Sequence, residues 1–345
     1  MRARWSIVLM VSLLAILLYG CASSQPVPQA GESQDSLDPG SPSASPANQD
    51  TGYSPDNSPS IELVVTTDFG KLLLLEATVE LGGEISALAA LKQVAQIETQ
   101  YGGGFVKSIN GVGSEYGGDS KQKNDWFIYF NGILSNVGAL DYTLCPGDVE
   151  HWDYRSWDFH QFVPAIVGDF PEPFRHGYGG TVYPTLVVYQ DGRVEAAGEI
   201  AAALARQGVA DVSVKSAAEL SAADKEADNI VLVGSAGFTL VDELNRPWDR
   251  LGFYCHFEEG YLKVFDGGGE LTGEYGAGDG VGLIQATQSI WNPDGVGACE
   301  NVVWMVSGTD DTGVEAAVEV LINSSDAFEY ACAIIILNGE IVKVP

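Results

Sequence analysis

The stretch from residue 22 to residue 60 constrains the fold of this chain most, because it holds too few apolar side chains to form a core. It consists almost entirely of Ser, Pro, Gln, Asn, Asp and Gly. Such a segment cannot bury enough apolar area to offset the entropy that folding costs, and is typical of disordered linkers. We therefore predict a flexible linker over residues 21–60 and a folded region that begins at Ile61.

A short export signal precedes this linker. Two arginines come before the apolar run of residues 7–18, and Cys21 follows the run. This order is typical of a signal peptide, here residues 1–20, and the run is shorter than the ~20 residues that cross a bilayer. Residues 18–21 also resemble the bacterial lipoprotein box, which implies a lipid on the Cys21 thiol. We expect an exported protein, anchored by this lipid on the extracytoplasmic face of the cell membrane; the alternative is simple secretion.

The charge of the chain excludes one class of partner. It has 47 acidic and 17 basic residues, a formal charge of −30, so a phosphate backbone would repel it and we expect no nucleic-acid partner. It has no clusters of Lys and Arg that would bind anionic lipid. Membrane contact is thus expected through the N-terminal lipid alone.

Residues 61–158 have the pattern of a small α+β domain. Alternating or continuous apolar runs predict strands, and apolar residues recur every three to four positions over residues 85–97, which predicts one helix that ends at a run of glycines. The predicted strands are residues 61–66, 75–81, 105–109, 126–130 and 149–154. One helix across such a sheet is a common way to close a small core.

Three motifs in this region carry a family resemblance. They are Asp-Trp-Phe-Ile-Tyr-Phe-Asn-Gly at residues 125–132, the segment 136–144, and Pro-Gly-Asp-Val-Glu-His-Trp at residues 146–152. Together they resemble the transcobalamin C-terminal-like domain, a β-grasp-type module of transcobalamin and intrinsic factor that also occurs in bacterial surface proteins. The resemblance implies a β-grasp-like fold for residues 61–158.

The resemblance also implies a ligand, because this module closes over one side of a corrinoid in the vertebrate carriers. A corrin has a broad apolar face rimmed by amides, so its site needs exposed aromatic side chains and amide-bonding loops. The candidate ligand-binding residues are Tyr101, Tyr116, Trp126, Tyr129, Phe130, Asn131, Trp152 and Trp157. The alternative for Trp126, Phe130 and Trp152 is a structural place in the core.

Residues 165–345 predict a second, α/β domain with a parallel or mixed sheet, because short apolar runs alternate with helical patterns. The predicted strands are residues 184–189, 212–214, 230–233, 302–306 and 333–337; the predicted helices are residues 196–207, 222–226, 238–244 and 314–321. We expect Thr312 and Glu315 to form a capping box and the glycine-rich residues 267–282 to form a mobile acidic loop.

Patterns for catalysis or metal binding are not found in the sequence. The four histidines form no zinc motif, and no Gly-x-Ser-x-Gly elbow occurs. Cys145, Cys255, Cys299 and Cys332 could form two disulfides in any of three pairings. We therefore expect a binding protein without a metal or cofactor rather than an enzyme.

Three functions are compatible with these features. The first is a membrane-anchored binding lipoprotein that captures a corrinoid for an uptake transporter. The second is a structural or adhesive protein of the cell envelope that has no small-molecule ligand. The third is a hydrolase, which would need a cleft where carboxylates with shifted pKa values converge.

Overall fold

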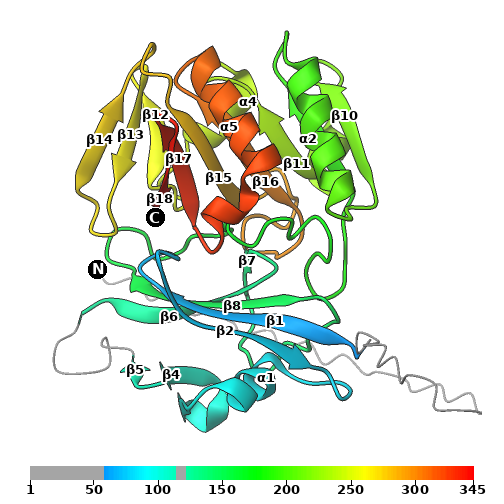
Figure 1. The fold of residues 1–345 in the computed structure, drawn as a ribbon, viewed down its shortest axis with the longest axis vertical. Coiled ribbons are helices and arrows are strands. Elements are labelled where there is room, and N and C mark those ends of the chain that lie inside the picture. The colour runs from blue at the N-terminus through cyan, green and yellow to red at the C-terminus, as the bar shows by residue number, and fades with distance from the viewer. Residues whose placement is uncertain (1–57, 114–121) are drawn as a thin grey trace, which may run out of the picture. The chain divides into compact units, whose positions relative to one another are not determined.

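The computed structural model describes residues 58–113 and 122–345, which lie in one compact unit, Asp56–Pro345 (Figure 1). The described residues form four β-sheets and five α-helices. None of those helices is long and apolar enough to cross a membrane. The predicted signal peptide, Cys21, residues 22–57 of the predicted linker and Tyr116 lie outside the described residues, and Ser60, at the end of that linker, is the first residue of β1.

The first sheet contains the strands predicted within residues 61–158, apart from residues 105–109. Its order is β2-β1-β8-β6-β7; β1 and β8 pair in parallel and the other neighbours pair antiparallel. The strands are β1 (Ser60–Thr67), β2 (Leu72–Glu80), β6 (Asn124–Phe130), β7 (Ile133–Leu134) and β8 (Val149–Ser156).

Helix α1 (Ala87–Val94) packs on this sheet through its apolar face. The Ser86 side chain caps its N-terminus by accepting a hydrogen bond from the Ala89 amide. A small antiparallel sheet follows, made of β3 (Ile97–Gln100), β4 (Phe105–Ile109) and β5 (Val112–Gly113), with a 3₁₀ turn at Tyr101–Gly103. The α+β character of this region is as predicted, whereas its assignment as a β-grasp stays a prediction.

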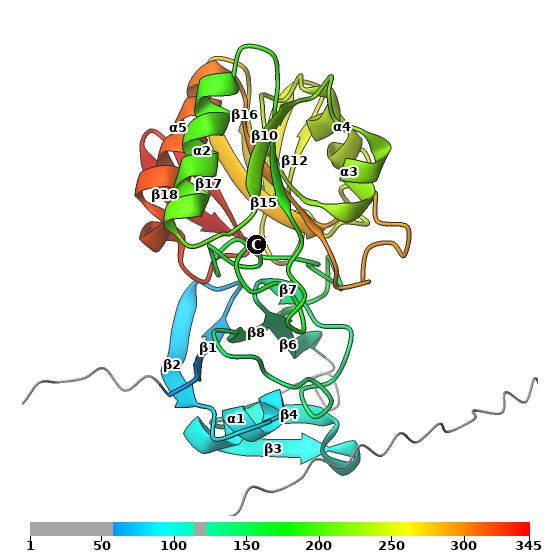
Figure 2. The same ribbon diagram turned by 90° about the vertical axis from the view of Figure 1, so that its right-hand side faces the viewer.

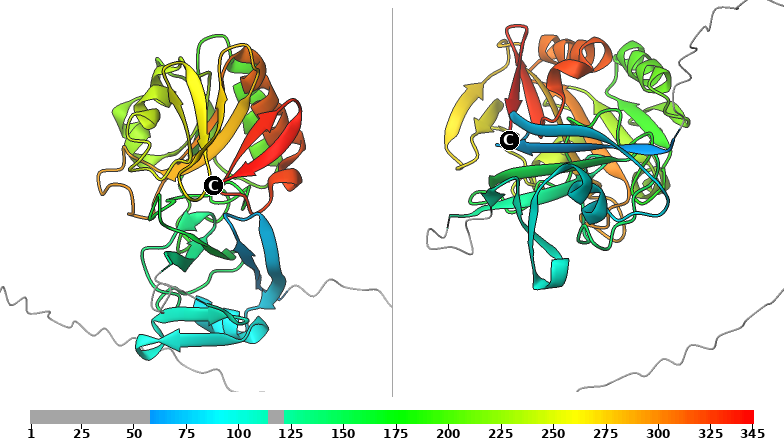
Figure 3. Two further views of the ribbon diagram at one scale, coloured as in Figure 1. Left: turned by 90° about the vertical axis from the view of Figure 1, so that its left-hand side faces the viewer. Right: turned by 60° about the horizontal axis from the view of Figure 1, so that its bottom comes forward.

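The second large sheet has seven strands and is mixed, as the alternating pattern predicted. Its order is β10-β9-β11-β16-β15-β17-β18; β10, β9, β11 and β16 are parallel, and each later neighbour is antiparallel. The strands are β9 (Thr185–Tyr189), β10 (Val212–Ser216), β11 (Asn229–Val233), β15 (Gly282–Gln288), β16 (Val302–Gly308), β17 (Ala333–Leu337) and β18 (Glu340–Val344). Figure 3 shows β17 and β18, in red, at one edge of this sheet.

Helices cover both faces of the seven-stranded sheet (Figure 2). On one face lie α2 (Val194–Arg206) and α5 (Asp311–Asn323), and on the other lie α3 (Ala222–Ala227) and α4 (Thr239–Asn245). Because successive side chains of a strand point to opposite faces, Val187 of β9 joins the core under α2 and α5, while Leu186 and Val188 join the core under α4. A short 3₁₀ helix, Ser325–Phe328, follows α5.

Two predictions for this second region are wrong. The glycine-rich residues 267–282 are not one loop: they contain β14 (Leu271–Tyr275), which pairs with β13 (Tyr261–Phe265) beside β12 (Cys255–Glu258) in an antiparallel sheet. The N-cap of α5 is Asp310, whose carboxylate accepts a hydrogen bond from the Gly313 amide, so Thr312 already lies inside the helix.

Candidate functional site

The order of the parallel strands creates a crevice at one edge of the seven-stranded sheet. From β9 the chain crosses to β10 on one side and then returns to β11 on the other side of β9. This reversal is a topological switch point, where the loops that leave two adjacent parallel strands diverge. In open α/β sheets, ligands bind in the crevice outside the carboxyl ends of such strands.

Two loops form the walls of this crevice. Gln190 directly follows β9, and its side-chain oxygen accepts hydrogen bonds from the amide and the hydroxyl of Ser235, in the loop after β11. Gly234 opens that second loop; a Cβ there would lie 2.6 Å from the Phe238 ring, so the loop requires a residue without a side chain. The two loops are therefore held together directly above the switch point.

The crevice is a pocket of about 590 Å³ with mixed polar and apolar lining. Its floor and walls are Gln190, Asp191, Ala217, Ala218, Leu220, Lys225, Gly237, Phe238, Thr239, Leu240 and Glu243. A second hollow of about 270 Å³ adjoins it and is lined by Gln190, Asp191, Gly192, Arg193, Asp311 and Glu315. Gln190 and Asp191 line both hollows and form the boundary between them.

The charges that line the two hollows are unequal in number. Lys225 pairs with Glu243 at 2.9 Å, and Arg193 pairs with Asp311. The side-chain carboxylates of Asp191 and Glu315 form no hydrogen bond or ion pair within the part of the chain that the structure describes. Two carboxylates are thus left without a positive partner, in a pocket that can hold a small molecule.

The aromatic side chain of Trp291 contacts two residues that line this pocket. The Trp291 indole nitrogen donates a hydrogen bond to Glu243 Oε2 at 3.2 Å, and the Lys225 ammonium lies 4.4 Å from the centre of the indole ring. These contacts orient Glu243 and Lys225 at the wall of the pocket.

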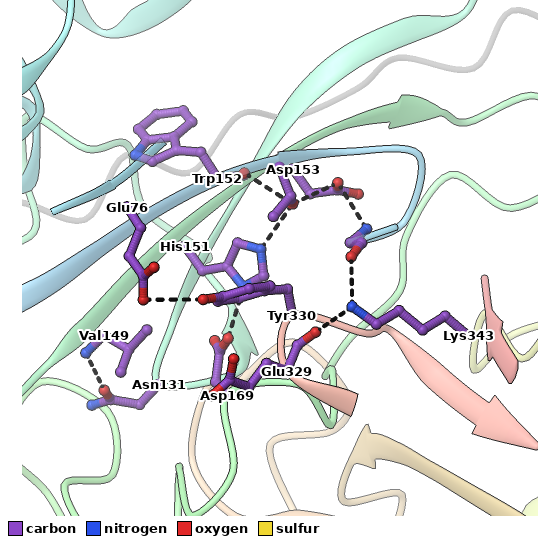
Figure 4. A network of polar contacts seen from close by, with 12 residues as sticks. Glu76, Asn131, Val149, His151, Trp152, Asp153, Asp169, Glu329, Tyr330 and Lys343 are labelled. Carbon is purple, nitrogen blue, oxygen red and sulfur yellow. Dashed lines mark hydrogen bonds and ion pairs between the residues drawn. The ribbon is translucent and has the colours of Figure 1, made fainter. Parts of the chain in front are cut away.

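A second polar cluster is buried where β1 and β8 run side by side (Figure 4). The Thr66 hydroxyl donates to Asp153 Oδ1 at 2.9 Å, so its oxygen can accept from His151 Nε2, also at 2.9 Å. His151 Nδ1 lies 2.7 Å from Asp169 Oδ1. Both ring nitrogens then donate, which describes a protonated imidazole.

The charges in this cluster balance. Burial would lower the pKa of His151, but the Asp169 carboxylate raises it further, so the net pKa lies above its usual value. The Arg155 guanidinium lies 3.9 Å from Asp153 Oδ2 and packs over the Phe127 ring at 3.7 Å. Two positive groups therefore face two carboxylates in a place that water does not reach.

Thr66 contacts His151, and His151 contacts Asp169. A catalytic triad of a nucleophile, a general base and an acid that orients the base has the same chain of contacts. However, Thr66 and His151 are 0% exposed, and the Thr66 hydroxyl is already engaged with Asp153. No substrate can reach such a hydroxyl. The cluster therefore acts in holding β1, β8 and the segment after β8 together.

Most of the residues predicted to bind a ligand are buried, and this corrects that prediction for them. Trp126, Tyr129, Phe130, Asn131 and Trp152 are all less than a tenth exposed. Their polar atoms bond within the protein: Trp126 Nε1 donates to the Val112 carbonyl, and Asn131 bonds Asp148, Gly177 and Val149. Trp152 Nε1 donates to Glu150 Oε1. These side chains have no surface to offer a corrinoid and form the core instead.

The remaining candidates are Tyr101, Trp157 and Tyr116. Tyr101 is 86% exposed, with its ring edge toward Phe105. Trp157 is half-buried, and the Lys123 ammonium lies 5.5 Å from the centre of its ring. Tyr116 lies outside the described residues.

The cysteines and histidines form no paired or metal-binding site among residues 58–113 and 122–345. Cys145, Cys255, Cys299 and Cys332 are all free thiols, so none of the three possible pairings is present. Within the same ranges, no three His, Cys, Asp or Glu side chains are grouped to hold a metal ion.

Sequence reasoning did not find the pocket residues. Gln190 and Asp191 directly follow a correctly predicted strand, and that position at the carboxyl end was the available signal. Lys225 and Glu243 reach the pocket from α3 and α4. Their convergence depends on the strand order, which the local pattern does not contain.

Comparison with known proteins identifies a segment of the chain. Residues 85–156 match a family described as "Domain of unknown function (DUF4430)". A solved structure from Ruminococcus gnavus ATCC 29149, described as a "putative metal binding protein", has 17% identity over 28% of this chain and 96% of that one. Its TM-score is 0.22, too low to support any conclusion here. No curated protein matches the chain.

The fold and the comparisons together define a class. The chain is a mixed α/β protein, and its DUF4430-like segment contains α1, the small sheet and the strands β6, β7 and β8 of the first sheet. This segment falls inside the stretch that resembles the transcobalamin C-terminal-like domain, and that finer resemblance stays a prediction.

Proposed function

We propose that this protein is an exported binding lipoprotein that captures a small, positively charged ligand with amino groups. The ligand site is the pocket at the carboxyl edge of β9, β10 and β11. The observation that carries this proposal is the pair of hollows that share Gln190 and Asp191 and include two unpaired carboxylates. A carboxylate in a pocket attracts an ammonium group, and the net charge of the chain raises the local concentration of cations.

The wall of the pocket favours a ligand that makes hydrogen bonds as well as ion pairs. The Gln190 side chain, Thr239 and the charged pair of Lys225 and Glu243 offer both donors and acceptors. An anion such as phosphate would face the carboxylates of Asp191, Asp311 and Glu315. These groups repel it, so we infer that anions are rejected.

The observations favour this pocket over the corrinoid site that the family resemblance implied. A corrinoid needs exposed aromatic surface, and five of the eight candidate residues are buried. Corrinoid capture for uptake is therefore the competing proposal, and the titration below tests both. The lipid anchor on Cys21 and the linker to residue 60 complete the proposal, because they would keep the pocket near the membrane.

Isothermal titration of the full chain tests the ligand class. The probes are putrescine as a small diamine, succinate as a small dianion, and cobinamide as a corrinoid. Of these three probes, we expect only putrescine to give saturable heat. Asp191→Asn should weaken putrescine binding at least about tenfold, since it removes one ion pair in a pocket.

Glu199→Gln is the matched control, because Glu199 is an exposed carboxylate of α2 outside the pocket. It should bind putrescine like the unmodified chain. Heat with cobinamide and none with putrescine would reject the proposed ligand class in favour of the corrinoid. Binding of putrescine that Asp191→Asn leaves unchanged would reject the proposed site.

A further inference from the structure

Strand β2 presents an unusual apolar surface at the outer edge of the five-stranded sheet. It pairs only with β1 on its inner side, and Figure 2 shows it outermost among the strands of that sheet. Three consecutive residues at its start are exposed: Leu72 by 61%, Leu73 by 46% and Leu74 by 47%. An uncovered edge strand with large apolar side chains is a site for pairing with another chain.

A β-bulge explains why three leucines in a row are exposed. Thr66 pairs with Leu73 and Val65 pairs with Leu75, so Leu74 has no opposite residue on β1. The extra residue interrupts the regular alternation of the strand, and Leu74 does not turn back into the core. Such a bulge also prevents an unbroken hydrogen-bond ladder along this edge.

The sequence of this edge is complementary to itself when it is reversed. Residues 71–76 read Lys-Leu-Leu-Leu-Leu-Glu. If two copies lie antiparallel about a two-fold axis between Leu73 and Leu74, each leucine faces a leucine. Lys71 of one copy then faces Glu76 of the other, twice in the same dimer. Opposite charges at facing positions stabilise antiparallel neighbours.

We propose that the occupant of this edge is a second copy of the chain, in a symmetric dimer through Lys71 and the first five residues of β2. Both copies use the same patch, as a two-fold interface requires. Because of the bulge, the leucine side chains and the two Lys71–Glu76 ion pairs carry the contact, not a continuous ladder. The proposal does not depend on the ligand pocket.

The two charged groups are available for this contact. Lys71 and Glu76 are exposed. Lys71 lies 3.6 Å from Asp68, an exposed pair of the kind that contributes little. Glu76 Oε1 accepts a hydrogen bond from the Tyr330 hydroxyl, a contact that orients the carboxylate (Figure 4). A partner lysine can approach the same carboxylate.

The dimer is expected to be weak in solution. The three exposed leucines on each copy cover much less than the roughly 800 Å² per partner of a standard interface, and the negative charge of the two copies opposes their association. A shared membrane would raise the effective concentration of the copies; this last point rests on the proposed lipid anchor.

Charge reversal tests the register. Sedimentation equilibrium of the full chain in mild detergent measures the dimer dissociation constant. Lys71→Glu and Glu76→Lys should each raise it about tenfold or more, since each variant places like charges opposite one another twice. The double variant Lys71→Glu/Glu76→Lys should restore the original value, and so should an equimolar mixture of the two single variants.

Glu80→Lys is the control, because Glu80 lies on β2 outside residues 71–76. It should leave the dissociation constant near its original value, and thermal unfolding should show all variants folded. A chain that stays monomeric up to millimolar concentration would overturn the proposal. So would a dimer that the single charge reversals leave unchanged, or a monomer that binds lipid vesicles through the leucines instead.

Discussion

Several ionisable side chains of this protein are buried away from water, and burial shifts their pKa values. Glu150 is the clearest case. Its carboxyl group is 0% exposed within the core of the five-stranded sheet, and Oε2 has no hydrogen-bond partner among the described residues. Burial raises the pKa of Glu150 to about 8, although the hydrogen bond from Trp152 lowers it. The group is therefore neutral in the folded protein at neutral pH.

The Glu150→Gln variant should remove a pH dependence of stability. Because the folded pKa is raised, the protonated carboxyl favours folding fully below about pH 4.5, and this advantage is lost as the pH rises toward 8. The gain in free energy of unfolding that the variant shows over the unmodified chain should be larger at pH 8 than at pH 5, by about 3 kcal/mol. Urea unfolding at both pH values measures this difference.

A stability difference that stays constant from pH 5 to pH 8 would contradict the account of Glu150. Glu98→Gln provides the comparison, since Glu98 is an exposed carboxylate in the small neighbouring sheet. The free energy of unfolding of Glu98→Gln should change with pH as that of the unmodified chain does between pH 5 and pH 8.

The buried cluster at β1 and β8 leads to a second prediction at this scale. Asp169→Asn should destabilise the fold by about 3 to 5 kcal/mol, because it leaves a buried His151 without its charged partner. Chemical unfolding at pH 6 measures this. The double variant His151→Gln/Asp169→Asn should cost less than the sum of its two single variants. Additive costs would show that the two side chains are not coupled.

The sequence predicted which residues lie in strands more reliably than which side chains bind a ligand. The apolar run at residues 126–130 located β6, and a core position for Trp126 and Phe130 was the stated alternative. The same pattern could not tell that Tyr129 and Asn131 are buried too. Tyr129 lies between the two large sheets, where its hydroxyl donates to the Val163 carbonyl, and that contact depends on the packing of distant segments.

Individual elements show where local pattern failed. Strand β15 (Gly282–Gln288) was missed because it contains Gln285, Thr287 and Gln288, polar residues that are typical of loops. All seven of its residues are buried, since the strand lies between β16 and β17 at the centre of the sheet. Gln288 bonds the Leu134 and Pro164 carbonyls there. Tertiary partners make such a strand possible.

The N-terminus of α5 gives a prediction at the scale of one element. Asp310 accepts hydrogen bonds from the amides of Gly313, Gly278 and Gly280, so it ties the helix to the end of the glycine-rich segment. Asp310→Ala should therefore lower the free energy of unfolding by about 2 kcal/mol. Thr312→Ala should change it by less than about 0.5 kcal/mol. Equal losses for the two variants, measured by urea unfolding, would favour the capping box predicted from the sequence.

At the scale of the whole molecule, the order of strands decides where a ligand can bind. The parallel strands and their helices were predicted nearly in full, but no local signal gave the order β10-β9-β11-β16. That order creates the switch point and brings residues after β9, β10 and β11 into one pocket. The sequence could therefore predict an α/β domain, but not its site.

Attachment to the membrane is also a property of the whole chain. We predict that Cys21→Ser releases the protein from the membrane fraction, because serine has no thiol for the lipid. Fractionation of the producing cells, with detection of the chain in each fraction, measures this. Equal amounts of the variant and the unmodified chain in the membrane fraction would contradict the proposed anchor.

The central claim is that this protein binds its ligand at the carboxyl edge of the seven-stranded sheet and not on the first sheet. Hydrogen–deuterium exchange of the full chain, with and without putrescine, tests it most directly. We predict that putrescine slows exchange in residues 190–193 and 234–243 and leaves residues 101–157 unchanged. Slower exchange confined to residues 101–157, or none at all at saturating putrescine, would contradict the claim.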